Sequence, residues 1–338
     1  MERDRSFDMA KGLGILLVIL GHIPTVPYEL KKIIYSFHMP LFFFISGYLY
    51  NSMKYNSFTL VQFIKSRFHK FIVPYFTIGF ICFFLFGVIY PLIRNGYSTE
   101  YLHSTFKFLF GLLYSRGGTS WMAWSSPLWF LTCIFISELI LYFALKHFKK
   151  HYLVFLIVGI VGYCYTLIIK IPLPWNVDAA LTATCFMYIG NICRRFNLLE
   201  HFKNMKYVAI LFVVLVLSIL FNSQIDFNLR NFGNIILTYC GGISGSILVL
   251  LLTNVIKQNK FLEFFGLNSL YMMGYTYCIL NIVILMNDTF KILDNFIINF
   301  IIQVILLSIL VLGILKVKQI KKALYSKQEQ ITIESNSQ

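Results

Sequence analysis

Long apolar segments separated by short polar ones fill almost the whole chain. A helix needs about 20 mainly apolar residues to cross about 30 Å of hydrocarbon, and ten segments approach or reach that length. Continuous apolar runs satisfy their backbone hydrogen bonds in lipid only as helices. The pattern therefore predicts an all-α, polytopic membrane protein with about ten transmembrane helices, at residues 11–29, 33–51, 71–92, 127–146, 152–170, 177–194, 206–222, 232–256, 268–287 and 296–315.

The polar connections indicate the domain organisation. None of them is long enough to fold by itself, so residues 1–320 are expected to form a single transmembrane domain. Residues 321–338 end in the polar run SKQEQITIESNSQ, and this composition predicts a disordered cytoplasmic tail. We find no internal repeat of the kind on which many secondary transporters are built.

Composition supports the membrane assignment and argues against a metal site. Hydrophobic residues make up 58% of the chain and charged residues 13%, whereas an ordinary soluble domain has about 25% charged residues. The seven cysteines lie inside apolar runs without CxxC spacing. They are therefore expected to be small core residues, and no metal ligand set is predicted.

Charge predicts the orientation in the membrane. If the N-terminus is cytoplasmic, 21 of the 29 lysines and arginines fall on the inner side, which is the bias that positive-inside topology produces. Both termini are therefore predicted to be cytoplasmic, with membrane lipids as the surroundings. The same bias accounts for the net charge of +15 without a nucleic-acid partner.

The first apolar segment carries ionisable residues, which are costly in a membrane and are retained there mainly for function. Asp8 and Lys11 are three residues apart, so on a helix they are neighbours on one face. His22 follows Lys11 by eleven residues, which is about three turns and about 16 Å along the same face. These spacings suggest a functional site, although Gly21 and Pro24 also allow His22 simply to end a helix at the outer interface.

A second histidine lies on the next apolar segment. His38 stands beside Met39 and Pro40, and proline is tolerated in the first turn of a helix, so we expect His38 to begin the returning helix. Two helices joined by a short loop are antiparallel neighbours, which would turn His22 and His38 toward one cavity. The alternative is that His38 is a hydrogen-bonded histidine at the interface.

The fourth apolar segment carries a carboxylate near its middle. Trp129 resembles an outer-interface anchor, and Glu138 lies nine residues further along, about 13 Å on a helix. A buried carboxylate needs a partner, and His22 and His38 are the expected ones. Glu138 could instead be protonated or could brace a neighbouring helix.

Basic residues gather where the first and third apolar segments meet the predicted cytoplasmic side. Arg67 and Lys70 lie in KSRFHKFIVPYF, and Arg5 and Lys11 lie at the start of the chain. Together they could form a cationic mouth suited to phosphates, which arginine binds as a fork and lysine as a point charge. Topology alone also explains such a cluster.

Several blocks of the sequence resemble the integral-membrane acyltransferase family 3, in particular its fucose 4-O-acetylase-like branch. They are RSFDMAKGLGILLVILGH, SFHMPLFFFISGYLY, RFHKFIVPYF, PLWFLTCIF and, more weakly, FGLNSLYMM. The resemblance implies a ten-helix enzyme of the bacterial inner membrane. Such an enzyme transfers an acyl group, usually acetyl from cytoplasmic acetyl-CoA, to a hydroxyl of a surface glycan or its lipid-linked precursor.

The resemblance also assigns roles to individual residues. It implies that His22 is the catalytic histidine, Lys11 the basic partner in its motif and His38 a second site histidine, with Arg67 near the CoA entrance. Many relatives carry a histidine shortly after the late SL block, where this chain has Thr276. A role at that position is therefore in doubt.

The proposed chemistry follows from the residue types. A sugar hydroxyl becomes a good nucleophile when a base removes its proton, and the ordinary pKa of histidine suits that task near neutral pH. His22 is the predicted base, oriented by Glu138 or His38, while an acyl-histidine intermediate is the competing route. A transporter or exporter of polysaccharide or lipid-linked sugar is the alternative function, and an inactive subunit a third. The sequence leaves the acceptor, the acyl group and the oligomeric state open.

Overall fold

The computed structural model describes residues 4–118, 120–169, 171–290 and 295–336, and these form helices and connecting loops without a β-sheet. Within this part of the chain six helices are long and apolar enough to cross a membrane. The prediction of an all-α, multi-pass membrane protein is therefore confirmed. The six segments are Leu60–Arg94, Ser126–His147, His151–Ile168, Ile235–Ile256, Ser269–Asn287 and Phe296–Lys321.

Every apolar segment identified in the sequence overlaps a helix, including four segments outside those six. The bounds, in chain order, are α1 Arg5–His22, α2 Tyr28–Tyr48, α3 Ser52–Asn56, α4 Leu60–Arg67, η1 Phe68–Ile72, α5 Val73–Cys82, η2 Phe83–Ile89, α6 Tyr90–Asn95, α7 Thr99–Tyr114, η3 Ser126–Leu128, α8 Trp129–His147, α9 His151–Ile168, η4 Pro174–Asn176, α10 Val177–Arg195, α11 Leu198–Phe202, α12 Met205–Phe221, α13 Ile235–Ile256, α14 Lys260–Leu267, α15 Ser269–Phe290 and α16 Phe296–Asn336.

Helices α1, α2 and α10 each carry a buried ionisable residue. Asp8, His38 and Asp178 are each buried on one of them. A helix with an ionisable residue in its apolar stretch is kept inside the bundle, away from lipid. These three helices therefore lie in the interior, as does α8, which carries the buried Glu138.

The start of α2 differs from the prediction. It begins at Tyr28, directly after Pro27, so His38 and Pro40 lie in the middle of the helix and not in its first turn. The expected boundary was wrong because the polar run from Tyr28 to Lys32 was assigned to the loop, although it forms the first turns of the helix. Pro40 is buried and contacts Gly242 of α13, and neighbouring helices make an internal proline acceptable in membrane proteins.

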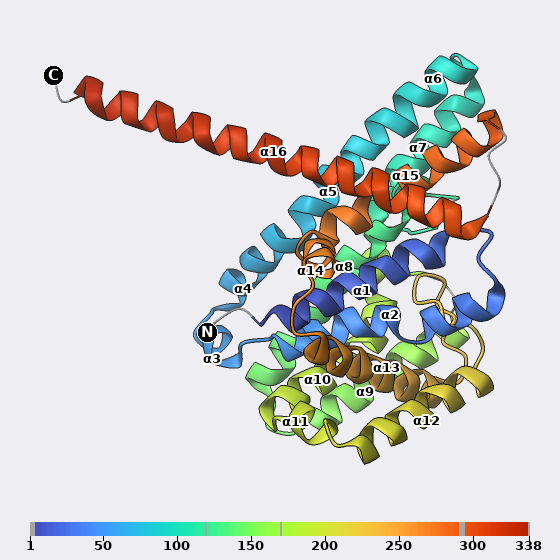
Figure 1. Ribbon diagram of the computed structural model, residues 1–338, viewed down its shortest axis with the longest axis vertical. Coiled ribbons are helices and arrows are strands. Elements are labelled where there is room, and N and C mark those ends of the chain that lie inside the picture. The colour runs from blue at the N-terminus through green and yellow to red at the C-terminus, as the bar shows by residue number, and fades with distance from the viewer. Residues whose placement is uncertain (1–3, 119, 170, 291–294, 337–338) are drawn as a thin grey trace.

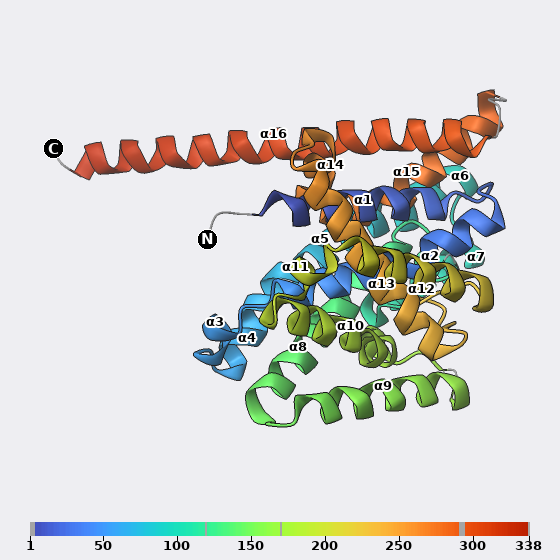
Figure 2. The ribbon, with the colours of Figure 1, turned by 60° about the horizontal axis from the view of Figure 1, so that its bottom comes forward.

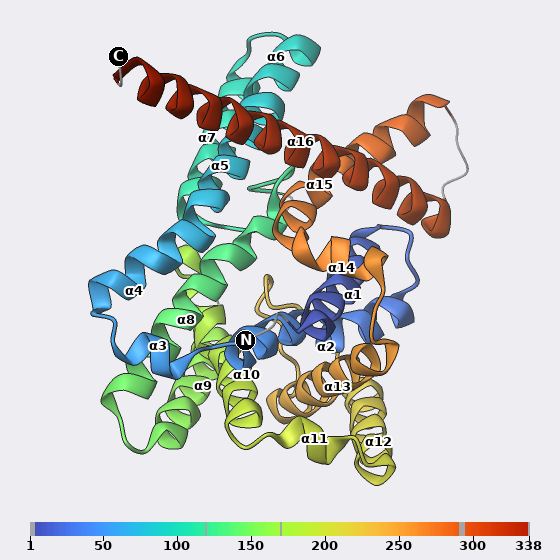
Figure 3. The same cartoon turned by 60° about the vertical axis from the view of Figure 1, so that its left-hand side comes forward.

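Two pairs of helices touch through glycines. Gly12 of α1 and Gly266 of α14 lie backbone against backbone, and Figure 3 shows α14 beside α1. Gly47 of α2 and Gly190 of α10 form the same kind of crossing. Small residues allow this close approach, which is the main source of helix packing in membranes. The first crossing joins the late sequence block FGLNSLYMM to the first helix.

Replacing Gly266 by alanine is expected to destabilise the protein. The added methyl group would overlap the carbonyl oxygen of Asp8, and overpacking costs about 1–3 kcal/mol or more when backbone cannot move away. The measurement is the thermal unfolding midpoint of the purified protein in detergent. Gly313→Ala is the matched control, because a methyl group there would meet no atom within 4 Å. Equal midpoints for both variants would contradict the close packing of α1 on α14.

Helices α9 and α16 lie at opposite edges of the bundle (Figure 2). Both expose large apolar side chains, among them Leu156 and Ile160 on α9 and Ile305 and Ile309 on α16. Helix α16 extends well beyond the rest of the molecule (Figure 1). It continues through the segment after residue 320, where the composition predicts a disordered tail.

Candidate functional site

Two cavities lie along the same four helices, α1, α2, α8 and α15. The first has a volume of about 310 Å³ and contains Lys11, Arg67 and Lys70 in its wall; we call it the basic cavity. The second has a volume of about 240 Å³ and contains His22 and His38; we call it the histidine cavity.

The order of the lining residues along each helix shows how the cavities are related. On α1, Lys11 lines the basic cavity and His22 the histidine cavity. On α15, Met273 lines the basic cavity and Tyr277 the histidine cavity. Helices α2 and α8 likewise line the basic cavity at one end and the histidine cavity at the other. The cavities are therefore stacked along one column of four helices.

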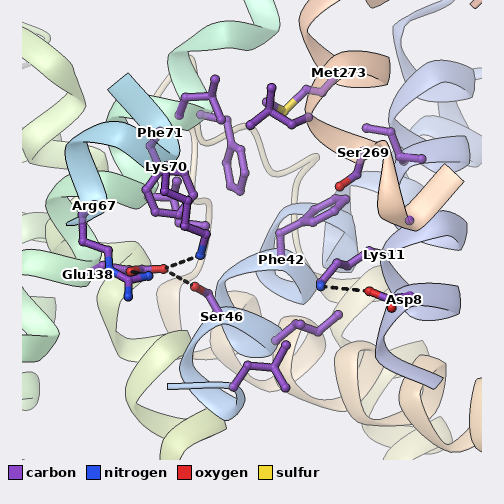
Figure 4. A pocket seen from close by; sticks show the side chains of 18 of the residues that line it. Asp8, Lys11, Phe42, Ser46, Arg67, Lys70, Phe71, Glu138, Ser269 and Met273 are labelled. Carbon is purple, nitrogen blue, oxygen red and sulfur yellow. Dashed lines mark hydrogen bonds and ion pairs between the residues drawn. The ribbon is translucent and has the colours of Figure 1, made fainter. Parts of the chain in front are cut away.

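Glu138 lies in the basic cavity, away from the two histidines (Figure 4). Its carboxylate pairs with the Arg67 guanidinium at 3.0 Å and with Lys70 Nζ at 3.5 Å, and it accepts a hydrogen bond from Ser46 Oγ at 2.7 Å. The expected pairing of Glu138 with His22 or His38 was wrong, because Arg67 at the end of α4 and Lys70 in η1 bring two cations to this carboxylate. Glu138 therefore neutralises Arg67 and does not orient an imidazole.

Arg67 is held on several sides. It is 7% exposed, its guanidinium lies 4.6 Å from the centre of the Tyr55 ring, and it donates a hydrogen bond to the Tyr55 hydroxyl. The helix changes to π-helical geometry immediately afterwards, over η1, and π-helical turns often occur at functional sites. This segment carries Lys70, whose side chain is 52% exposed.

The remaining basic residues divide between two places. Lys11 Nζ lies 3.4 Å from Asp8 Oδ1 in the basic cavity. Arg5 instead lines a separate, open hollow with Lys257 and Lys260, which shares Asp8 with the basic cavity. The four cations were expected to form a single opening, but the structure divides them between two adjoining hollows: Lys11, Arg67 and Lys70 line the basic cavity, and Arg5 lines the other.

His22 and His38 line one cavity, as their positions on neighbouring helices predict. His22 Nδ1 lies 3.3 Å from the Tyr35 hydroxyl and 3.4 Å from the Tyr277 hydroxyl. His38 Nδ1 donates a hydrogen bond to the Ile34 carbonyl at 2.9 Å. That bond leaves Nε2 of a neutral His38 as the unprotonated nitrogen.

Trp129 lies in the wall of the histidine cavity and is 6% exposed. Its expected place as an anchor at the lipid interface was therefore wrong. Helix α8 begins inside the bundle, after the buried 3-10 turn η3, and so its first residue faces protein.

A loop between α12 and α13 completes the histidine cavity. Residues 225–229 line it, and among them Asp226 carries a carboxylate. Asp226 Oδ1 accepts a hydrogen bond from the Leu229 backbone at 2.9 Å. Burial raises the pKa of the Asp226 carboxyl above its ordinary value, while the backbone N–H groups of Leu229 and Asn228 and the nearby Arg230 act in the opposite direction.

Sequence reasoning missed Tyr35, Tyr277 and Asp226. Tyr35 precedes His38 by three residues, a helical spacing that could have suggested a shared face. Asp226 stands alone as an acid in the connection between two apolar segments. Thr276, noted as a departure from the family pattern, is buried and donates to the Met272 carbonyl at 2.6 Å; the next residue, Tyr277, is the one that reaches His22.

The described residues contain no group of three or more histidine, cysteine, aspartate or glutamate side chains placed to hold a metal ion. The two cavities offer imidazole, carboxylate, ammonium and guanidinium groups. Such groups suit proton transfer and the binding of anions.

Comparison with known proteins identifies the family. A family model described as "Acyltransferase domain" matches residues 4–315. The chain therefore belongs to this acyltransferase family, family 3, and the resemblance drawn from its sequence blocks is confirmed. Together with its apolar helices, this makes the protein a multi-pass membrane acyltransferase.

Curated relatives match over a shorter stretch. The nodulation protein NolL of Mesorhizobium japonicum is 52% identical over 58 residues, which cover 14% of this chain and 16% of the relative. The nodulation protein NolL of Sinorhizobium fredii is 47% identical over 60 residues, with the same coverage of 14% and 16%. The matched stretch is thus a small part of either relative. No solved structure matches the chain.

Proposed function

We propose that the protein is an O-acyltransferase that moves an acetyl group from cytoplasmic acetyl-CoA to a hydroxyl of a surface glycan or its lipid-linked precursor. The observation that carries the proposal is the stacking of a cationic cavity and a histidine-lined cavity along one column of helices. This arrangement suits a phosphate-bearing donor at one end and a hydroxyl acceptor at the other.

The membrane placement follows from the charge distribution. Helices α1, α2, α10 and α12 cross the bilayer with the six long apolar helices, which gives ten spans in the bacterial inner membrane. The excess of lysine and arginine puts both termini on the cytoplasmic side. The basic cavity then opens toward the cytoplasm, where acetyl-CoA is found.

Donor binding uses the cations of the two adjoining hollows. Lys11 and Lys70 in the basic cavity and Arg5 in the adjoining hollow attract the phosphates. Arg67 contributes less as a direct phosphate ligand, since Glu138 already neutralises it at 3.0 Å. The pantetheine arm extends along the column toward His22.

The arm must pass between the two cavities. Phe42 of α2 and Phe130 of α8 both line the basic cavity, with ring centres 5.7 Å apart. Each is within one turn of a residue of the histidine cavity, Met39 and Trp129 respectively. The two rings are therefore the groups that the acyl chain meets at the boundary.

The reaction at the histidine cavity is a direct acyl transfer. The acceptor hydroxyl gives its proton to a nitrogen of His22 while its oxygen attacks the thioester carbonyl carbon. The carbon–sulfur bond breaks, the sulfur takes up the proton, and free CoA and the O-acyl ester leave. Tyr35 donates its hydroxyl proton to the Gly21 carbonyl, so its oxygen can accept from Nδ1–H of His22. In that tautomer Nε2 is the unprotonated nitrogen and acts as the base.

The test is thioester consumption by the purified, detergent-solubilised protein. Labelled acetyl-CoA is supplied with surface glycan from producing cells that has been O-deacylated by mild base. We expect release of free CoA with equal transfer of label to the glycan, both dependent on adding the glycan. A transporter would leave the thioester intact, and that result would overturn the proposal.

A further inference from the structure

The loop that carries Asp226 is fixed to the bundle by a buried ion pair. Arg230 Nε lies 2.7 Å from Asp178 Oδ2, and its Nη2 donates to Asp178 Oδ1 at 3.1 Å and to Asn176 Oδ1 at 2.8 Å. Asp178 lies in the first turn of α10, Asn176 is the N-cap residue of that helix, and both are at most 1% exposed. A two-pronged, desolvated contact of this kind is among the stronger polar interactions in proteins.

The backbone of the loop is also held in an unusual conformation. Arg230 has a φ of 59°, in the left-handed region that residues other than glycine rarely adopt. Asp226 and Asn231 exchange two backbone hydrogen bonds, of 2.7 and 2.9 Å, which close the loop. A strained residue persists only where its surroundings over-determine it. The loop is therefore a rigid part of the cavity wall.

The charge of the cavity wall limits what can bind. Among the described residues that line the histidine cavity, Asp226 is the one acid, and none is lysine or arginine. An anionic group placed there would face a carboxylate, and the nearby Arg230 is outside the lining and already paired with Asp178, so the cost of burial would not be offset. Neutral hydroxyl groups, by contrast, donate strong hydrogen bonds to a carboxylate.

The size and the other lining residues of the histidine cavity fit a small ring-shaped ligand that carries polar groups at its edge. The volume of about 240 Å³ is below the roughly 300–1,000 Å³ of typical drug-sized ligand sites. Trp129 offers an aromatic surface, and Asn228 adds a side-chain oxygen that has no hydrogen-bond partner among the described residues. One monosaccharide unit matches this combination.

We propose that Asp226, held in place by the Arg230–Asp178 pair, binds a hydroxyl of the acceptor adjacent to the one that is acylated, and thereby selects an uncharged sugar unit over one bearing a carboxylate or phosphate. The inference rests on the proposed function and narrows its acceptor. Asp226 sets acceptor affinity and specificity, while His22 performs the proton transfer.

The experiment compares the wild-type enzyme with Asp226→Asn, which keeps the shape of the side chain and removes its charge. The acceptors are the O-deacylated glycan of the producing cells and the matched methyl glycosides of glucose and glucuronic acid. Loss of a charge-assisted hydrogen bond predicts an acceptor KM about 10- to 100-fold higher. The KM for acetyl-CoA is expected to stay within twofold, and the preference for the neutral glycoside to fall.

Two controls separate affinity from folding. Glu200→Gln removes an exposed acid that pairs with Lys203 at 2.7 Å and lines neither cavity, and it is expected to change neither KM. Asp178→Asn weakens the anchor of the loop, and it is expected to raise the acceptor KM together with a lower unfolding midpoint, whereas Asp226→Asn keeps the wild-type midpoint.

The outcomes distinguish this inference from the proposed function. If the wild-type enzyme releases no CoA with the native glycan, the proposed function fails. If it is active but Asp226→Asn keeps the wild-type acceptor KM and neutral preference, the inference is overturned while the function stands. Identification of the acylated unit of the native glycan as an acidic sugar would overturn it as well.

Discussion

Replacing His22 by glutamine is expected to lower the rate of acyl transfer by about 10²- to 10⁴-fold, the contribution typical of a positioned general base. Glutamine can still bond to the Tyr35 and Tyr277 hydroxyls, so the cavity should keep its shape. It cannot accept the proton of the acceptor. The measurement is kcat for CoA release with saturating glycan, and the KM for acetyl-CoA should change little because the proposed phosphate site at Lys11 is about 16 Å away along α1.

A surface histidine gives the matched control. His201 is exposed and its Nδ1 donates to the Asn197 carbonyl, so His201→Gln should have wild-type activity. Full activity of His22→Gln would remove His22 from the mechanism and would turn attention to His38, whose Nε2 is the unprotonated nitrogen of a neutral ring. A labelled acyl-enzyme that survives rapid denaturation in the wild type and is absent from the variant would favour the acyl-histidine route.

Replacing Glu138 by alanine is expected to lower the free energy of unfolding by about 3–5 kcal/mol, because it leaves a buried guanidinium without its counter-ion. Arg67 is 7% exposed and would lose the one carboxylate with which it forms an ion pair among the described residues. The Ser46 hydroxyl would lose its acceptor too. The measurement is reversible unfolding in mixed micelles, followed by tryptophan fluorescence.

The double variant Arg67→Met, Glu138→Leu distinguishes a lost counter-ion from a lost contact. Replacement of both partners of a buried ion pair by apolar residues often changes the free energy of unfolding little. The double variant should therefore be more stable than Glu138→Ala. Equal loss in the two would contradict the ion-pair explanation. If Glu138→Ala were instead fully stable but inactive, Glu138 would have a direct part in catalysis.

The sequence was sufficient to locate the helices but not all of their ends. Apolar length alone decides where a chain crosses lipid, and so each predicted segment overlaps a helix. The pattern failed at the start of α2, where Glu29, Lys31 and Lys32 look like loop residues. They are helical because glutamate and lysine are good helix formers, so a charged run can form the first turns of a helix.

From the sequence, only site residues on the same helix could be placed relative to one another. Lys11 and His22 lie on one helix, so helical geometry alone relates them. Helical spacing could not identify the partner of Glu138, because Arg67 is 71 positions away in the chain and lies on a different helix. The place of Asp226 in the cavity wall could not be predicted either. Its loop is held by contacts of Arg230 with Asp178 and Asn176, which lie about 50 positions earlier in the chain and come together only in the folded protein.

Lys11 and His22 lie on the same helix, α1, so the distance between them is set by helical geometry. Under the proposed function, this helix fixes the separation between the charge that would bind the nucleotide end of the donor and the imidazole that would meet its thioester. A carrier with an arm of matching length would then place its carbonyl at the reacting nitrogen while its phosphates stay bound. Short thioesters such as acetyl-N-acetylcysteamine lack the phosphates, so we expect them to be poorer donors than acetyl-CoA.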